Sequence, residues 1–156
     1  MSKSLKRVRT ALEGVGLVAD IREMPGETRT AQQAADAAGC ALDQIAKSII
    51  FRGEVSGTAI LFLTAGGNQV DAGKASAVAG EALGKAEAAL IRAQTGFAIG
   101  GVAPVGHLTP ILAFLDPRLL EFDVVWGAAG TPRHIFPIDP AVLLRVTGAR
   151  QADFIV

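Results

Sequence analysis

The segment from Ala93 to Leu115 runs for 23 residues without a formal charge, and it is the strongest constraint that this sequence places on its fold. A stretch of that length and polarity could cross a bilayer as a helix. Residues 96–110 within it, GFAIGGVAPVGHLTP, hold four glycines and two prolines, which oppose a continuous helix. We therefore predict a buried strand, a shaped loop and a second strand, and no membrane association.

The loop over residues 96–110 has two interpretations. It is either a tight connection between two buried strands or a ligand loop whose exposed N–H groups hold an oxygen atom of a substrate. The glycines lack the spacing of the dinucleotide fingerprint. The stretch GGNQVDAGKAS has Ala75 where a nucleotide P-loop needs Ser or Thr to ligate magnesium. A nucleotide-cofactor enzyme is therefore not expected, and we predict no cofactor.

The composition of the chain limits which classes of protein remain possible. The chain has 156 residues, of which 50% are hydrophobic and 19% charged, which predicts one globular domain over residues 1–156. Fifteen basic and fifteen acidic residues cancel, so any nucleic acid should be bound locally rather than along an extended duplex. One cysteine and two histidines argue against a disulfide and against a Cys/His metal site. With no export signal in the first twenty residues, we expect a cytoplasmic protein.

The pattern of apolar residues mixes helices and strands without regular βαβ alternation. It predicts an α+β domain around a mixed, partly closed β-sheet surrounded by helices. Thr30 with Gln33 forms a capping box, and Asp139 followed by Pro140 begins a last helix. We expect helices over 5–15, 31–38, 71–79, 87–95 and 140–147, a short helical turn over 116–122, and strands over 17–23, 47–53, 58–66, 96–101, 111–116, 123–130 and 133–138.

Lys47 is the residue that most needs an explanation, because strand alternation places it on one face with Ile49 and Phe51. It either lies at the strand end and extends to water or is a cation at the edge of a pocket, aimed at a phosphate or carbonyl oxygen. The search for a nucleophile is negative. Ser56 lacks the G-x-S-x-G context, and Cys40 has no histidine near it in sequence.

Five stretches in this order resemble one known family: TRTAQQAA, QIAKSIIF, LFLTAGGNQVDAGK, QTGFAIGGVAPVGH and WGAAGTPRHIF. The family is YbaK, the aminoacyl-tRNA deacylases related to the editing domain inserted in bacterial prolyl-tRNA synthetases. The resemblance covers nearly the whole chain. It implies the editing-domain fold and a free-standing enzyme that hydrolyses the ester of mischarged tRNA, with water or a substrate group as the attacking species.

The resemblance also implies which residues act. The family's lysine matches Lys47, and its G-x-x-x-P loop, which holds the aminoacyl ester and the terminal adenosine, matches residues 100–104. We therefore expect catalytic roles for Lys47, Gly100 and Gly101, and substrate contacts from Val102, Ala103, Pro104, His107, His134 and Thr30.

His107 and His134 each have a structural alternative as well. Some members of the family have an aspartate near the position of His134, so the resemblance does not identify which amino acid is removed from the tRNA. The expected partners are the acceptor end of mischarged tRNA and an associated prolyl-tRNA synthetase, with no prediction for the oligomeric state. The competing hypothesis is a non-catalytic module that binds an aminoacyl end, a nucleotide or a protein.

Overall fold

The computed structural model describes residues 2–156. These residues contain five α-helices, two short 3₁₀ helices, η1 and η2, and strands that do not alternate regularly with the helices. The helices are α1 (Lys3–Gly14), α2 (Ala31–Ala38), η1 (Leu42–Gln44), α3 (Ala72–Ala79), α4 (Ala88–Thr95), η2 (Pro117–Glu121) and α5 (Pro140–Thr147). The strands are β1 (Arg22–Glu23), β2 (Ala46–Gly53), β3 (Ala59–Ala65), β4 (Leu83–Lys85), β5 (Leu112–Leu115), β6 (Val125–Ala128), β7 (His134–Ile138) and β8 (Arg150–Gln151).

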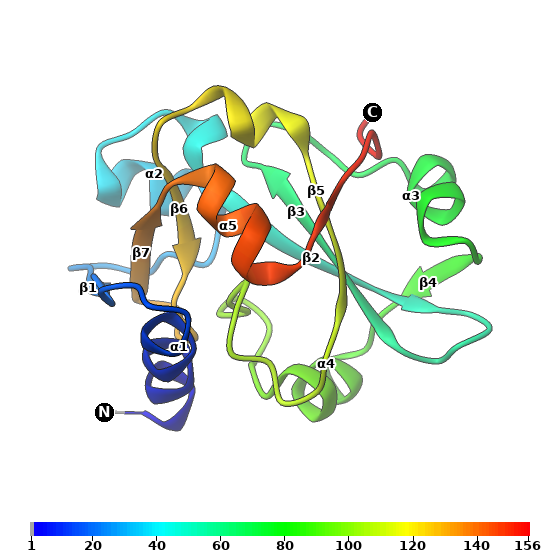
Figure 1. Cartoon of the computed structure of the whole chain (residues 1–156), viewed down its shortest axis with the longest axis horizontal. Helices are drawn as coiled ribbons and strands as arrows, with labels where there is room; N and C mark the ends of the chain where they lie inside the picture. Colours follow the sequence, from blue (N-terminus) through cyan, green and yellow to red (C-terminus); the bar gives the residue numbers. More distant parts are fainter. Residues whose placement is uncertain (1) are drawn as a thin grey trace.

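The strands form two sheets. A five-stranded sheet in the order β4-β2-β3-β5-β8 crosses the centre and right of Figure 1, and a three-stranded sheet, β1-β7-β6, lies at the left. The larger sheet is mixed, because β3 pairs antiparallel with β2 and parallel with β5. The predicted α+β class with a mixed sheet is confirmed, although the strands divide between two sheets that meet at the bridge between Ile45 and Trp126.

The β2–β3 hairpin is the centre of the molecule, as the sequence predicts. Every residue of β3 is buried, which explains its unbroken apolar run. Leu61 and Leu63 pack on one side of the sheet with α1 and α5 residues. Ile60 and Phe62 pack on the other side, where Phe62 contacts the rings of Phe51, Phe114 and Phe154.

Helix ends follow the predicted caps. Thr30 makes both bonds of its capping box with Gln33, and Gly39 ends α2 in the left-handed conformation. The Asp139 carboxylate accepts hydrogen bonds from the amides of Ala141 and Val142 at the start of α5. The expected helices are therefore confirmed.

Two strand predictions fail. Of the strand expected over 17–23, only Arg22 and Glu23 pair with a neighbour. The strand expected over 96–101 is absent, because the chain turns there: the Gly101 amide donates to the Ala98 carbonyl at 3.1 Å, and Gly100 has a φ of +88°. Of the apolar side chains in this segment, Phe97 is buried in the core, whereas Ile99 is exposed.

Candidate functional site

A cavity of about 500 Å³ opens where the two sheets meet. Strand β2 pairs with β3 along its length, but β4 covers its other edge only at residues 51–53. The rest of that edge, together with α2, strands β6 and β7, and the loop after α4, encloses the cavity. Its lining consists of Thr28, Arg29, Thr30, Ala31, Ala34, Ile45, Ala46, Lys47, Ser48, Ile49, Ile50, Ile91, Ile99, Gly100, Val102, Trp126, Gly127, Ala128 and Ile135.

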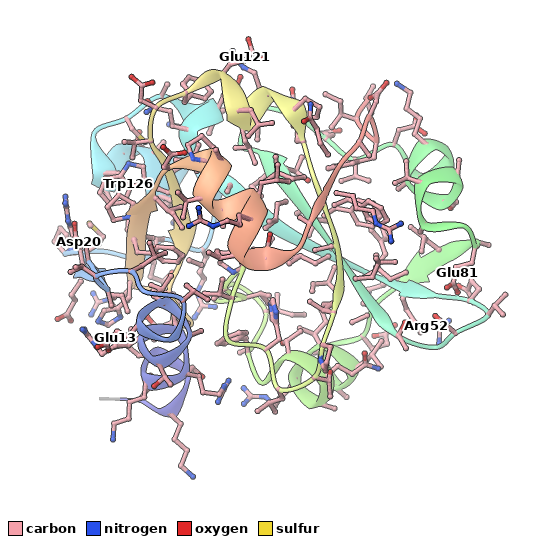
Figure 2. All side chains as sticks on the ribbon, in the orientation of Figure 1. Glu13, Asp20, Arg52, Glu81, Glu121 and Trp126 are labelled. Carbon is pink, nitrogen blue, oxygen red and sulfur yellow. The ribbon has the colours of Figure 1, made fainter. Side chains whose placement is uncertain are left out.

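Most of the lining is apolar. Ala34, Ile45, Trp126 and Ile135 belong to one small hydrophobic cluster that joins α2 to β6 and β7. Figure 2 labels Trp126 at this side of the molecule, where α2 lies beside the smaller sheet. An apolar cavity with few polar groups is the usual architecture of a small-molecule site. The cavity is therefore suited to an uncharged side chain of modest size.

The loop after α4 contributes the polar main-chain groups. Neither Gly100 nor Val102, both of which line the cavity, has a hydrogen-bond partner for its amide N–H among residues 2–156. Gly100 needs its positive φ, and a Cβ there would lie 2.9 Å from Nη1 of Arg29. Two residues of the cavity lining thus have amide donors that are unpaired within residues 2–156, and the Arg29 guanidinium lies beside one of these residues, Gly100.

Lys47 extends from β2 under the turn that follows β3. Its ammonium group donates a hydrogen bond to the Asn68 carbonyl. Burial lowers the pKa of Lys47 from its ordinary value of 10.5, and the carboxylates of Asp116 and Asp43 oppose that shift. An ammonium group has three donors and this structure uses one of them. The remaining two are available to an oxygen atom of a ligand.

Three hydroxyl side chains line the cavity, and two of them serve the fold. The Thr30 hydroxyl accepts from the Gln33 amide as the cap of α2, and the Thr28 hydroxyl donates to the Pro132 carbonyl. The Ser48 hydroxyl is buried without a hydrogen-bond partner. No carboxylate, imidazole or thiol lines the cavity within residues 2–156, so Ser48 has no base beside it.

The structure brings together only part of the predicted site. Lys47, Gly100, Val102 and Thr30 line the cavity. Other expected site residues lie outside that lining: Gly101, Ala103, Pro104, His107 and His134.

Those five residues have structural partners instead. Gly101 packs against the backbone of Thr131, and a Cβ there would lie 3.1 Å from the carbonyl carbon of that residue. The His134 imidazole shares a hydrogen bond of 2.6 Å with the Thr131 hydroxyl. Ala103 is fully buried, and Pro104 and His107 line a second cavity together with residues of α1 and α5.

His107 lies behind the loop. Its Nε2–H donates to the Ala103 carbonyl at 2.7 Å, and its ring packs edge-on against Phe97. Burial lowers the pKa of His107 below its ordinary value of 6.5, the hydrogen bond to Ala103 opposes this shift, and the charge of Arg7 adds to it. The ring is therefore neutral near pH 7, a state suited to a structural role.

The prediction from sequence missed Arg29 and the apolar wall of Ile45, Trp126 and Ile135. Arg29 precedes α2, Ile45 follows η1, and Trp126 and Ile135 lie in β6 and β7. These segments are far apart in the chain, so no local motif could identify the residues as one wall. Arg29 directly precedes the Thr30 cap, and its position over Gly100 depends on how α2 packs.

Within residues 2–156, no three His, Cys, Asp or Glu side chains are grouped so that they could hold a metal ion. In the same range, no helix has both the length and the apolar character needed to cross a membrane.

Comparison with known proteins shows the family to which the chain belongs. The model of the aminoacyl-tRNA editing domain family matches residues 25–146. The uncharacterized protein YwhH of Bacillus subtilis (strain 168) is 34% identical over 140 residues, which are 90% of this chain and 88% of YwhH.

Two crystal structures are also similar. One is described as a candidate trans-editing enzyme for prolyl tRNA synthetase. It is 48% identical, with a TM-score of 0.93, over 100% of this chain and 99% of its own. The other, of a hypothetical protein, is 27% identical with a TM-score of 0.88, over 96% of this chain and 99% of its own.

The family match extends over most of the chain and includes both Lys47 and the loop at Gly100. It confirms the predicted editing-domain resemblance and the predicted enzyme class, an aminoacyl-tRNA deacylase. The chain belongs to the aminoacyl-tRNA editing domain family.

Proposed function

We propose that the cavity holds the aminoacyl end of a mischarged proline tRNA and that the chain hydrolyses its ester in trans, removing a small non-cognate amino acid. A single observation carries the proposal: within residues 2–156, the apolar cavity is lined by Lys47 and by two residues with free main-chain N–H donors, but by no carboxylate, imidazole or thiol. The similar structure described as a candidate trans-editing enzyme for prolyl tRNA synthetase supports this choice of tRNA.

The amides of Gly100 and Val102 are the donors that we assign to the ester carbonyl. As water attacks, the carbonyl oxygen gains negative charge, and fixed N–H groups stabilise that charge more strongly than they stabilise the ground state. One such donor contributes roughly 3 kcal/mol. Gly101 takes part through its packing on Thr131, because its own amide already bonds to Ala98.

The attacking group in this proposal is water or a hydroxyl group of the substrate. The Ser48 hydroxyl is the only lining hydroxyl within residues 2–156 without a structural role, but no carboxylate, imidazole or thiol lies beside it to remove its proton. An aminoacyl ester is already an activated acyl group, so orientation and charge stabilisation can supply most of the rate enhancement. No metal or cofactor is required.

Lys47 and Arg29 are the cations that we assign to the acceptor end of the tRNA. Both line the cavity, and the Arg29 guanidinium is half exposed; within residues 2–156 its only carboxylate partner is Glu27, at 3.4 Å. Guanidinium and ammonium groups both bind phosphate oxygens well. With no net charge on the chain, we expect few phosphate contacts and a shallow dependence of affinity on salt.

We further propose that residues 1–156 act as one editing domain and that the protein associates with prolyl-tRNA synthetase. Helix α1 precedes the residues that the family model matches, but Leu5, Val8 and Leu12 are buried in the main core. The association would deliver newly mischarged tRNA. Co-sedimentation of the purified chain with prolyl-tRNA synthetase, with and without tRNA, tests it.

The decisive experiment is a deacylation screen. Proline tRNA charged with alanine, cysteine, serine, 2-aminobutyrate or proline is incubated with the purified chain, and loss of the ester is measured. We expect rapid hydrolysis of at least one small non-cognate ester, slow hydrolysis of the prolyl ester, and no effect of EDTA. Tight binding of the aminoacyl end without hydrolysis would instead support the non-catalytic binding module.

A further inference from the structure

One side chain of α1, Arg7, joins residues 96 and 106, which are the two ends of the part of the loop that contains Gly100 and Val102. The Arg7 guanidinium donates from Nη2 to the Gly96 carbonyl at 2.6 Å and from Nε to the Gly106 carbonyl at 3.3 Å. Its central carbon lies 4.9 Å from the centre of the Phe97 ring. Within residues 2–156 no carboxylate forms an ion pair with Arg7, so its contacts are with the loop.

We propose that Arg7 is a positioning residue that fixes the two ends of the loop and thereby aligns the Gly100 and Val102 donors with the ester carbonyl. The inference rests on the function proposed above. It assigns a role in the reaction to a helix that lies outside the residues matched by the family model.

The loop depends on outside contacts because its own main chain supplies few. Between Val102 and Gly106, no amide N–H makes a main-chain hydrogen bond within residues 2–156. The His107 ring bonds to the Ala103 carbonyl, and Arg7 bonds to the carbonyl of Gly106. Without these two side chains, the middle of the loop would have no hydrogen bond to hold its conformation.

Helix α1 is a firm base for this contact. Its apolar side chains are buried in the core, and its backbone touches the loop directly. A Cβ at Gly106 would lie 3.1 Å from the Arg7 carbonyl oxygen, and a Cβ at Gly130 would lie 2.9 Å from that of Ser4. The starting point of the Arg7 side chain is therefore fixed relative to the cavity.

The expected consequence is kinetic. A displacement of about 1 Å in a catalytic group can lower a rate by up to about a hundredfold without weakening ground-state binding. Loss of Arg7 should therefore reduce kcat while leaving KM nearly unchanged. Lysine has a single nitrogen on a flexible stem and cannot span both carbonyls as the planar guanidinium does. It should rescue only part of the rate.

The test compares Arg7→Met, Arg7→Lys and the matched control Lys6→Met in the full chain. Lys6 is an exposed cation of the same helix without a side-chain bond to the loop. We expect kcat on the mischarged tRNA to fall roughly tenfold for Arg7→Met, with KM within about twofold, and to fall less for Arg7→Lys. Lys6→Met should retain the wild-type kcat.

Two further measurements separate positioning from general stability. Added guanidinium ion, well below concentrations that unfold the protein, should restore part of the Arg7→Met rate. Hydrogen exchange in Arg7→Met should become faster over residues 96–106 but not over the β2–β3 hairpin.

An unchanged kcat with unchanged exchange in the loop would overturn the proposal. Faster exchange throughout the core, with no rescue by guanidinium, would also overturn it by assigning Arg7 to general stability. If the wild-type chain hydrolysed no mischarged tRNA, the proposed function would fail, and the exchange data would still decide whether Arg7 holds the loop.

Discussion

The two sides of the loop over residues 96–110 differ in how their polar groups are satisfied. On the cavity side, the amides of Gly100 and Val102 have no partner within the described chain, and the surroundings are apolar. On the opposite side, Arg7 and His107 bond to main-chain carbonyls of the loop. Unsatisfied donors are costly unless a ligand fills them, whereas paired groups stabilise the fold. The loop therefore has one side suited to binding a ligand and one side whose hydrogen bonds hold its conformation.

The largest effect should come from Gly100→Ala, which alters the cavity side directly. A side chain at φ +88° costs about 1 kcal/mol in backbone strain, and its Cβ would meet the Arg29 guanidinium. Displacement of one N–H group that donates to the ester carbonyl lowers the rate by about a hundredfold. We expect that loss in steady-state deacylation, with a fall of about 3 °C in Tm by calorimetry.

Gly26→Ala is the matched control for this change. Gly26 has open space around it and no positive φ, so activity and Tm should stay near wild type. A Gly100→Ala variant that hydrolysed the ester at the wild-type rate would remove the loop from the mechanism and leave both of its sides structural.

The second largest effect should follow from removal of the Lys47 ammonium group. Lys47→Met keeps the apolar stem but removes the ammonium donors, and we expect deacylation to fall by about tenfold, or roughly 1.4 kcal/mol. Tm should change by at most a few degrees, because Asn68 is half-buried and its carbonyl can turn to water. Single-turnover kinetics with saturating enzyme measure this change, with the exposed Lys85→Met as the control.

A smaller effect, on selectivity, should follow from a change in the apolar lining of the cavity. Ile50 lines the cavity, and Ile50→Val removes one methylene group. The ratio of kcat/KM for the 2-aminobutyryl ester to that for the alanyl ester should rise a few-fold, because one methylene contributes only about 1 to 3 kcal/mol to discrimination. Unfolding in urea should show a loss of about 1 kcal/mol. An unchanged ratio would show that Ile50 does not contact the acyl side chain.

The smallest effect on the rate should come from His107→Gln on the supporting side, because this change keeps the hydrogen bond to the loop. In His107→Gln, the side-chain amide can still donate a hydrogen bond to the Ala103 carbonyl. Deacylation near pH 7.5 should therefore stay within about twofold of wild type. An equally large loss for this variant and for Gly100→Ala would erase the difference between the two sides of the loop.

Stability should nevertheless depend on pH through His107. Its pKa in the folded protein is lower than in the unfolded chain, so the unfolded chain binds the proton first as pH falls. Stability is therefore fully present above pH 6.5 and declines below it toward the folded pKa. Tm of wild type between pH 7.5 and pH 5 should fall more steeply than Tm of His107→Gln.

Local patterns predicted most of the fold because their physical causes are local. The capping box at Thr30, the Asp139–Pro140 helix start and the alternating apolar hairpin each depend on neighbouring residues alone. The strand predicted over 96–101 failed because Gly100 turns the chain with a positive φ, which an apolar pattern does not reveal.

The sequence by itself determined the hairpin, the helices, the glycine-rich loop and the lysine near the start of the central strand, since propensities, caps and apolar periodicity act over a few residues. Tertiary structure decided which of these residues meet. Lys47, Gly100 and Arg29 surround one cavity only because the edge of β2 is uncovered where the two sheets join. Similarly, Arg7 reaches Gly96 and Gly106 only because α1 packs against the loop, a contact between segments about ninety residues or more apart. Such long-range contacts depend on the packing of the whole core, which no short pattern encodes.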